Sequence, residues 1–401
     1  MLTKKAEHLL NCTCGARHYA DVLPCPVPLA TGQYVFVPSI FGLGLFFLLL
    51  FFVTPASAEP QPPPHVLFDA PINATWAANH GEAWREKGFS GFLFQGILDN
   101  LRPYPSEEKF FNTAIGAPVQ EKIIPGNWES LLAEISGAVN RLKAAGLEHN
   151  FLRFSITPSR PYFTEPALRK IAESRLQLAG ACCRQTGLRG IALDTASTNG
   201  FYDYRWEGHP PNSSPEELSA GARQFARTLL RAFIRACPDG EILLLVRNME
   251  TAPPLWYAFL AGALESVGAA DTIPISLVSY TSDLPREAAY YRNQPRTIKR
   301  LIKKRTSPAA YEHWERQCGL SFAFEPVHYM NSMPTARYSI DRYRHALYAA
   351  AINGHRYTII HAPHGGWWHI PPDIAEQFSH LKQGGRARVQ FAPPVPVPLD
   401  A

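Results

Sequence analysis

The chain has 401 residues, a formal net charge of +5 and 46% hydrophobic residues, which suits one large domain with a sizeable core. Its Lys and Arg residues are scattered, whereas a nucleic-acid groove would need more basic residues with interleaved aromatics. The densest basic cluster, Lys299 to Arg305, indicates a solvated helix end. Composition therefore gives no support to a nucleic-acid partner.

The first strong signal is an uncharged apolar run from Tyr34 to Val53. Small residues at Ala56 and Ala58 match the signal-peptidase pattern and predict cleavage after Ala58. The run is also long enough to remain as an uncleaved membrane anchor. Either way we expect an exported protein, periplasmic or extracellular, with membrane contact only through residues 34–53.

The segments around the predicted domain carry little fold information. Residues 1–58 are interpreted as an extension plus export segment, 59–64 as a Pro-rich tether and 386–401 as a Pro-rich tail. The extension holds Cys12, Cys14 and Cys25, fewer ligands than a closed zinc site requires. A true start codon further downstream would also explain this extension.

Eight short apolar runs, typical of buried parallel strands, alternate with amphipathic stretches over residues 65–385. The expected strands are His65–Ile72, Ser90–Ile97, Asn150–Thr157, Gly190–Ala196, Glu241–Asn248, Pro274–Thr281, Leu320–Tyr329 and Tyr357–Ala362. The expected helices are Trp128–Ala145, Pro166–Thr186, Ser214–Cys237, Pro254–Val267, Ile340–Asn353 and Ile374–Leu381. Glycines follow several helices at Gly146, Gly187 and Gly354, and Ser214 is a candidate N-cap.

Eight β/α units in series predict an α/β fold of the (β/α)₈ TIM-barrel type, in a single domain. The alternative is an open doubly wound sheet. That fold usually carries a Gly-rich phosphate turn after its first strand, and the segment DAPINATW has no glycine. There is no P-loop motif either, so a nucleotide enzyme is not indicated.

Active sites of such barrels lie at the carboxyl ends of the strands. Two carboxylates there, Asp194 and Glu325, each interrupt an apolar strand, and a charge in such a place is costly unless it is paired or used. Glycoside hydrolysis needs two flanking carboxylates, an acid and a base or nucleophile. We expect Asp194 as the acid and Glu325 as the nucleophile or base. Alternatively, Asp194 pairs structurally with Arg153 or Arg247.

Other polar and aromatic residues fall at the same predicted rim, where flat rings can pack against sugars and polar groups can hold hydroxyls. The candidate substrate-binding residues are Asp69, Trp76, Arg153, Asp203, Arg205, Trp206, Glu207, Arg247, Tyr280, His328, Tyr329, His361, His364, Trp367 and Trp368. A metal site from His361, His364, Asp194 and Asp69 is an alternative. However, Pro363 breaks the spacing of the two His residues, and we expect neither a metal nor another cofactor.

With Asp194 in ALDTAS and Glu325 in AFEPVHY, the chain resembles the large superfamily of retaining (β/α)₈ glycoside hydrolases. The resemblance implies an acid/base at the end of the fourth strand and a nucleophile at the end of the seventh. That superfamily usually has Asn-Glu at the fourth strand, where this chain has Leu193-Asp194, so Asp203 or Glu207 is a substitute candidate.

Three functions follow, in order of preference. The first is an exported hydrolase of poly- or oligosaccharides. The second is a non-catalytic glycan-binding barrel of the cell envelope, and the third is a metal-dependent hydrolase. In an oxidising compartment Cys183 and Cys237, near the ends of consecutive helices, could form a disulfide, or they could be free buried thiols.

Overall fold

The computed structural model describes most of residues 65–361. The described ranges are 65–70, 72–95, 128–155, 162–195, 201–246, 249–267, 273–280, 287–324, 328–330, 333–335 and 340–361. The chain divides into two units at Gln61–Pro62. The first unit, with the expected export segment, lies outside the described residues, as do the tether at 59–64 and the tail at 386–401.

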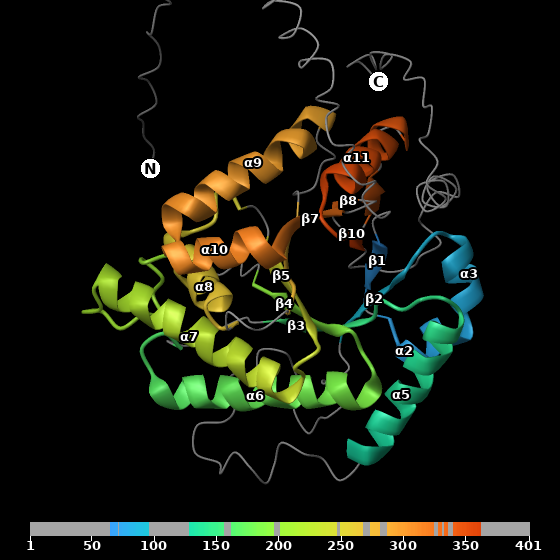
Figure 1. Cartoon of the computed structure of the whole chain (residues 1–401), viewed down its shortest axis with the longest axis horizontal. Coiled ribbons are helices and arrows are strands. Elements are labelled where there is room, and N and C mark those ends of the chain that lie inside the picture. The colour runs from blue at the N-terminus through green and yellow to red at the C-terminus, as the bar shows by residue number, and fades with distance from the viewer. Residues whose placement is uncertain are drawn as a thin grey trace, which may run out of the picture. The chain divides into compact units, whose positions relative to one another are not determined.

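Eight parallel strands close into a barrel in the order β1-β10-β7-β6-β5-β4-β3-β2 (Figure 1). Closure comes from β1 and β10, where His65 is the register partner of Tyr357 and Asp69 that of His361. The strands are β1 (His65–Ala70), β2 (Gly91–Phe94), β3 (Phe151–Ser155), β4 (Gly190–Asp194), β5 (Glu241–Val246), β6 (Ile275–Tyr280), β7 (Cys318–Phe324) and β10 (Tyr357–His361). The (β/α)₈ prediction is confirmed, and the open sheet is excluded.

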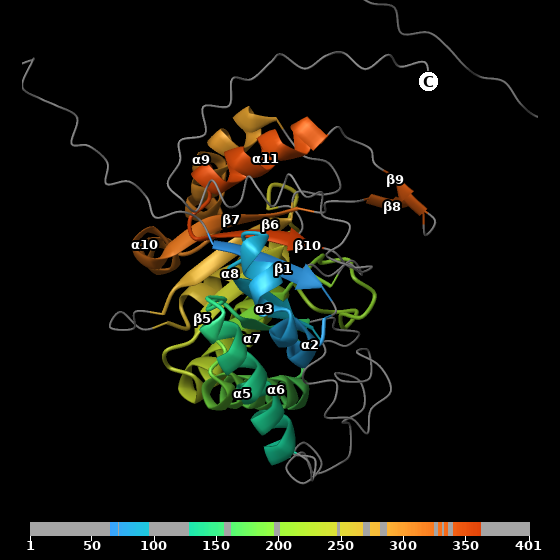
Figure 2. The same cartoon turned by 90° about the vertical axis from the view of Figure 1, so that its right-hand side faces the viewer.

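Helices surround these strands (Figures 1 and 2). They are α2 (Ala74–Asn79), α3 (Gly81–Glu86), α5 (Trp128–Ala144), α6 (Pro166–Thr186), α7 (Pro215–Ala236), α8 (Pro254–Leu264), α9 (Ala288–Arg305), α10 (Pro308–Gln317) and α11 (Ile340–Asn353). Ser214 begins α7 with a capping box, because it accepts from Glu217 N while the Glu217 side chain accepts from Ser214 N. Gly146 and Gly187 have positive φ, as expected after helix ends. Within the described ranges no helix is long and apolar enough to cross a membrane.

Several boundaries differ from the sequence expectation. The seventh strand runs from Cys318 to Phe324 rather than to Tyr329, and residues 325–327 lie outside the described residues. Residues His328–Met330 instead form β8, which pairs antiparallel with β9 (Met333–Thr335). The helices α2, α3 and α10 were not anticipated, and of α9 only the basic end at Lys299–Arg305 was expected as helix. The expected helix at Ile374–Leu381 lies outside the described residues.

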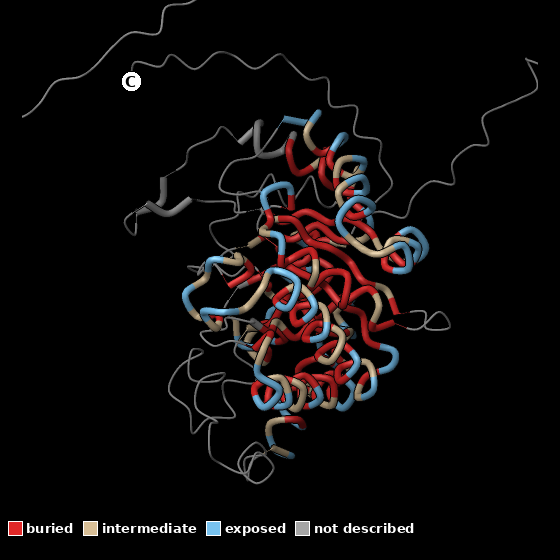
Figure 3. The backbone as a smooth tube through the Cα atoms, turned by 90° about the vertical axis from the view of Figure 1, so that its left-hand side faces the viewer, coloured by how far each residue is buried: buried red, intermediate tan, exposed pale blue. Residues whose placement is uncertain are grey.

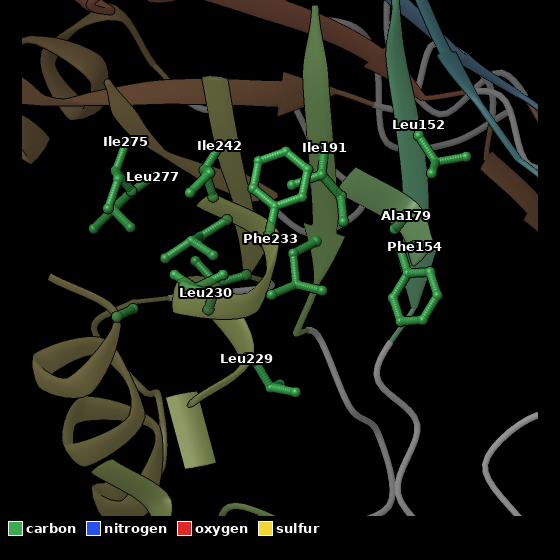
Figure 4. Close-up of a cluster of buried hydrophobic side chains, with 14 of the residues drawn as sticks. Leu152, Phe154, Ala179, Ile191, Leu229, Leu230, Phe233, Ile242, Ile275 and Leu277 are labelled. Carbon is green, nitrogen blue, oxygen red and sulfur yellow. The ribbon is translucent and has the colours of Figure 1, made fainter. Parts of the chain in front are cut away.

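Apolar side chains form two packed layers. One fills the barrel interior and contains Leu67, Leu93, Phe151, Ala192, Leu243, Leu245, Val278, Ala323, Tyr357 and Ile359. The other lies between strands and helices, where Phe233 of α7 packs among strand residues such as Ile191 and Ile242 (Figure 4). Figure 3 shows the same division, with buried backbone in the strands and exposed positions along the outer helix faces. Packing on both faces of the strands, in the barrel interior and against the helices, holds the carboxyl ends of the strands in place.

Candidate active site

Strand alternation places polar side chains above the apolar interior. Successive strand residues point to opposite faces, so residues two apart share one face. Each pair joins an interior residue to a polar residue two positions further toward the carboxyl end: Leu67 and Asp69, Leu93 and Gln95, Phe151 and Arg153, Ala192 and Asp194, Val278 and Tyr280, Ile359 and His361. Six strands therefore contribute one polar side chain each to the mouth of the barrel.

Five hydrogen bonds converge on the carboxylate of Asp69, which is 0% exposed. Gln95 Nε2 donates to Oδ1 at 2.9 Å, and Arg153 Nη1 donates to Oδ1 and Oδ2, both at 2.7 Å. Tyr280 donates its hydroxyl to Oδ2 at 2.7 Å. His361 Nδ1 lies 2.8 Å from Oδ2, a contact that places a proton on Nδ1. Asp69 thus fixes the orientation of four neighbouring side chains.

The charge state of Asp69 follows from these contacts. Burial by itself would raise the pKa of the Asp69 carboxyl, but the charge of Arg153 and the hydrogen bonds from His361 and Tyr280 outweigh it and hold the pKa well below its usual value. Burial also opposes the charge of Arg153, yet Asp69 and Asp194 raise the pKa of the guanidinium well above its usual value. Asp69 and Arg153 are therefore a fully ionised buried pair at neutral pH.

Arg153 also connects the buried carboxylate to a second, more accessible one. Its Nη2 donates to Asp194 Oδ2 at 2.6 Å, and the Asp194 side chain is 18% exposed. The backbone that carries Asp194 is held by the next residue, because Thr195 N and Oγ1 both donate to Leu245 O, at 2.9 and 2.8 Å. Trp256 Nε1 of α8 donates to the same Thr195 Oγ1 at 3.0 Å. The pairing of Asp194 with Arg153, one of the two interpretations left open by the sequence, is present.

Two residues of this region were not among the catalytic or substrate-binding candidates. Gln95 is the residue after β2, recognisable from the sequence as a polar strand end, and its place two positions beyond Leu93 brings it to the barrel mouth. Tyr202 lies in the loop after β4, is almost fully buried, and has a hydroxyl without a hydrogen-bond partner in the described ranges. Burial and the charge of Asp194 raise the pKa of Tyr202 far above its usual value. Its ring packs against Phe201 and Phe259 in the layer between strands and helices.

The aromatic candidates of the described rim pack mainly within the protein. Trp76 in α2 lies against His80, with ring centroids 4.3 Å apart, and also contacts Trp84 at 6.4 Å. Trp206 meets Phe201 edge-on at 5.2 Å and lies against the core. Both rings are only partly buried, so each retains some exposed surface but neither joins the Asp69 network.

The charged residues of the loop after β4 also stay apart from that network. Asp203 accepts from Arg205 N at 2.9 Å, and this contact lowers the pKa of Asp203. The Arg205 side chain is 91% exposed, and Glu207 is exposed as well. These positions are those of a surface loop, which weakens Asp203 and Glu207 as replacements for Asp194.

The remaining candidates are not described at the level of side chains. Arg247, Glu325, His364, Trp367 and Trp368 lie outside the described residues. His328 and Tyr329 belong to β8, for which only the backbone is described. Of the sequence candidates, the structure thus brings together Asp69, Arg153, Asp194, Tyr280 and His361.

Metal binding and disulfide formation were alternatives in this region. No group of three His, Cys, Asp or Glu in the described ranges is arranged to hold a metal ion. A site using Asp69 would also have to displace the Arg153 guanidinium from both carboxylate oxygens.

Cys183 and Cys237 are both free thiols and buried, and Cys183 Sγ donates to Gly190 O at 3.2 Å.

Comparison with known proteins returns fold likenesses only. No protein-family profile and no curated protein sequence matches the chain. Among solved structures, a glucosidase from Croceicoccus marinus is 12% identical, with 80% of this chain and 68% of that chain covered and a TM-score of 0.49. A GH5_18 protein from Streptomyces cattleya is 11% identical, with 83% of each chain covered and a TM-score of 0.48. A 3-keto-D-glucoside 4-epimerase from E. coli is 14% identical, with 80% and 99% covered and a TM-score of 0.39. Such neighbours catalyse different reactions, so the barrel fold rests on this chain's own strand pairing and the chemistry on its own site.

Proposed function

We propose that this chain is a glycan-acting hydrolase that cleaves glycosidic bonds at the carboxyl-terminal mouth of its barrel. The observation that carries the proposal is the ionised network in which Arg153 joins the buried Asp69 to the more exposed Asp194. Buried charges are expensive to maintain, and this network lies at the end of the barrel where enzymes of this fold place their chemistry. A fixed carboxylate beside positioned hydroxyl, imidazole and guanidinium groups suits a polyhydroxylated substrate.

The second carboxylate of the proposed reaction is Glu325. It is the first residue after β7 and stands two positions beyond Ala323, an interior residue of the barrel. Continuing the alternation by one step predicts that Glu325 joins the inward-facing set, and the same argument applies to Arg247 after Leu245 of β5. Asp194 and Glu325 would then flank a bond bound in the mouth.

The contact with Arg153 favours a change in the roles expected from the sequence. A carboxylate that accepts a charge-assisted hydrogen bond from a guanidinium is held in a fixed orientation, which suits a nucleophile or base. We therefore assign Asp194 as the nucleophile or base and Glu325 as the general acid. Tyr280 and His361, whose side chains are fixed by Asp69, would hold sugar hydroxyls.

The test is hydrolysis by the full-length chain across a panel of polysaccharides and aryl glycosides. Asp194→Asn and Glu325→Gln should each lower kcat/KM by about a thousandfold or more on natural polymers. With an activated aryl leaving group, which needs no protonation, Glu325→Gln should recover most of its activity and Asp194→Asn should not. Glu207→Gln is the matched control, because Glu207 is an exposed carboxylate in the loop that follows β4 and Asp194. Its kcat/KM should stay near the wild-type value.

A non-catalytic glycan-binding barrel is the second candidate, and the Asp194–Arg153 ion pair is the observation that favours it. In such a barrel Asp194 and Arg153 would bind substrate hydroxyls together, and Asp194 would take no part in bond cleavage. Glycan binding without hydrolysis of any substrate in the panel would reject the enzyme proposal and support this one. Full activity in Glu325→Gln would reject the assignment of the second carboxylate.

We also propose that the chain is exported through residues 34–53, with cleavage after Ala58. The support is the uncharged length of this run and the small residues at Ala56 and Ala58. Mass spectrometry of the chain recovered from a bacterial host should find Glu59 as the mature N-terminus. Recovery of the intact N-terminus from the membrane fraction would show an uncleaved anchor instead.

A further inference from the structure

Helix α9 is the most basic element of the described chain. Its 18 residues, Ala288–Arg305, include four Arg and three Lys and no Asp or Glu. The buried side of the helix is formed by Tyr291, Gln294, Ile298 and Ile302. All seven basic residues are exposed on the remaining surface.

Three of the seven cations have partners on neighbouring helices. Lys299 Nζ lies 2.6 Å from Glu315 Oε1 of α10. The ammonium of Lys303 lies 5.5 Å from the ring centroid of Tyr311, and the guanidinium of Arg305 lies 4.5 Å from that of Tyr257. These contacts account for the side of α9 that faces α10 and α8.

The other four cations, Arg292, Arg296, Arg300 and Lys304, have no hydrogen bond, ion pair or ring contact within the described ranges. They recur at every fourth position, so they form one ridge, which we call the α9 ridge. At a rise of 1.5 Å per residue, the charges are about 6 Å apart along the axis and span about 18 Å. The ridge begins at the end of α9 that follows the carboxyl end of β6, which is the end nearer the barrel mouth in chain order.

This arrangement is unfavourable for the helix itself. Like charges four residues apart on a helix repel each other, and the α9 ridge contains three such pairs in succession. The helix dipole favours cations only in the last turn, which explains Lys304 but neither Arg292 nor Arg296. A solvated helix end, the interpretation expected from the sequence, therefore accounts for only the final part of the ridge.

We propose that the α9 ridge binds an anionic polysaccharide, a linear chain with one carboxylate or sulfate group per sugar. Three of its four cations are Arg, whose planar guanidinium pairs with carboxylates in two parallel hydrogen bonds. The four charges follow a ridge that winds slowly around the helix, and their even spacing complements the evenly spaced charges of such a polymer. The inference relies on the proposed function for its choice of a glycan, and it narrows that glycan to an acidic one.

Two other anionic partners fit the ridge less well. A helix that lies on a membrane needs apolar residues beside its basic ones, and the exposed residues of α9 are polar or small. Single-stranded nucleic acid binding relies on exposed aromatic platforms, whereas Tyr291 of α9 is buried and Tyr290 is partly buried. A polyanion without bases or acyl chains is the remaining match.

The test measures binding of the full-length chain to polygalacturonate, which carries one carboxylate per ring, with uncharged dextran for comparison. The ridge variant carries Arg292→Gln, Arg296→Gln, Arg300→Gln and Lys304→Gln. The control variant carries Arg141→Gln, Lys143→Gln, Lys170→Gln and Arg231→Gln, four exposed cations of α5, α6 and α7 that give the same change in charge. Each variant is also prepared with Asp194→Asn, so that binding is measured without hydrolysis at the mouth.

The wild-type chain should bind polygalacturonate, and four charge contacts should weaken that binding about 20-fold when salt rises from about 50 to about 150 mM. The ridge variant should lose at least about tenfold in affinity and most of the salt dependence, while the control variant stays near wild type. Equal binding by both variants, or equal binding to dextran, would overturn the proposal. Tighter ridge-dependent binding to phosphatidylserine vesicles or to single-stranded DNA would do the same. If the ridge variant loses binding and the wild-type chain hydrolyses no substrate of the panel, the proposal of polysaccharide binding by the α9 ridge stands and the hydrolase proposal is rejected.

Discussion

Asp69→Asn is the sharpest test of the network at the barrel mouth. The substitution keeps the shape of the side chain but removes its charge and turns one acceptor oxygen into a donor. Oδ1 accepts from Gln95 and Arg153, and Oδ2 accepts from Arg153, Tyr280 and His361. Whichever oxygen is replaced, at least two donors then face an NH₂ group, and the guanidinium cannot reverse its role.

The magnitude follows from the burial of both partners. Removing one member of a buried ion pair costs about 3–5 kcal/mol, because the other charge stays behind without compensation. Arg153 is 12% exposed and keeps Asp194 as a partner, so the lower end, about 3 kcal/mol, is expected. At roughly 2–4 °C per kcal/mol, Tm should fall by about 6–12 °C.

The pH dependence gives an independent check. Because the pKa of Asp69 is held below that of an Asp in the unfolded chain, about 3.9, the unfolded state binds more protons in acid. The stabilisation by Asp69 is therefore complete above about pH 5 and is lost as the pH falls toward the lowered folded-state pKa. The stability difference between wild type and Asp69→Asn should be constant at neutral pH and should narrow below about pH 4.

Urea unfolding of the full-length chain, followed by Trp fluorescence, measures both effects. Asp203→Asn is the control, because Asp203 is 39% exposed and its ion pair with Arg205 is worth at most about 1 kcal/mol. Adding Arg153→Met to Asp69→Asn should recover part of the lost stability, since the buried guanidinium is then gone and only the more exposed Asp194 loses an ion-pair partner. If Asp69→Asn unfolds within about 1 kcal/mol of wild type at pH 7, the network does not have the charge state argued above.

Three further predictions concern other parts of the barrel. Tyr357→Phe removes the 2.6 Å hydrogen bond to the buried Glu241 at the amino-terminal end of the barrel. Urea unfolding should show that the free energy of unfolding falls by about 2 kcal/mol, while kcat/KM is unchanged because the site lies at the opposite end. A loss of activity at equal stability would contradict this. Trp256→Phe removes the hydrogen bond to Thr195, the residue after Asp194. The substitution should cost roughly 1 kcal/mol of stability and should also lower kcat, because Asp194 is then held less firmly. Unaltered kinetics would show that Thr195 does not position Asp194. Arg296→Glu turns two repulsive pairs of the α9 ridge into attractive ones, so the chain should gain about 0.5–1 kcal/mol at low salt, and the gain should vanish at high salt. A gain that persists at high salt would have a cause other than charge.

The fold could be predicted because each buried strand is a nearly continuous apolar run, which sequence alone reveals. The ends of strands were harder: Leu320–Tyr329 reads as one run, yet His328 and Tyr329 belong to a separate strand, β8, which pairs antiparallel with β9. Only the basic end of helix α9 was expected, although its buried residues, Tyr291, Gln294, Ile298 and Ile302, have helical spacing over the whole helix. The dense basic residues and the internal Pro295 obscured that stripe.

Most residues of the site could be predicted from the sequence, but the hydrogen bonds and ion pairs that join them could not. Asp69, Arg153, Asp194, Tyr280 and His361 were identified because each is a polar residue within or at the carboxyl-terminal part of an apolar strand, and these parts meet at one rim. The sequence gives no sign that Asp69, rather than Asp194, is the centre of the hydrogen bonds, because that depends on which side chains meet across the barrel. Nor could aromatic composition separate Trp206, which packs on Phe201, from a ring presented to a ligand.

The closure of the barrel by β1 and β10 has a consequence for biosynthesis. The paired residues His65 and Tyr357 are about 290 residues apart, so one edge of β1 has no native partner until nearly all of the domain has been made. At about 5–20 residues per second, that edge waits roughly 15–60 s after β1 leaves the ribosome. An apolar strand with unpaired backbone groups is a template for pairing between nascent chains. A chain that stops before Tyr357 would keep open edges on both β1 and β7, and we expect such fragments to be recognised by chaperones or to aggregate rather than to accumulate as smaller barrels.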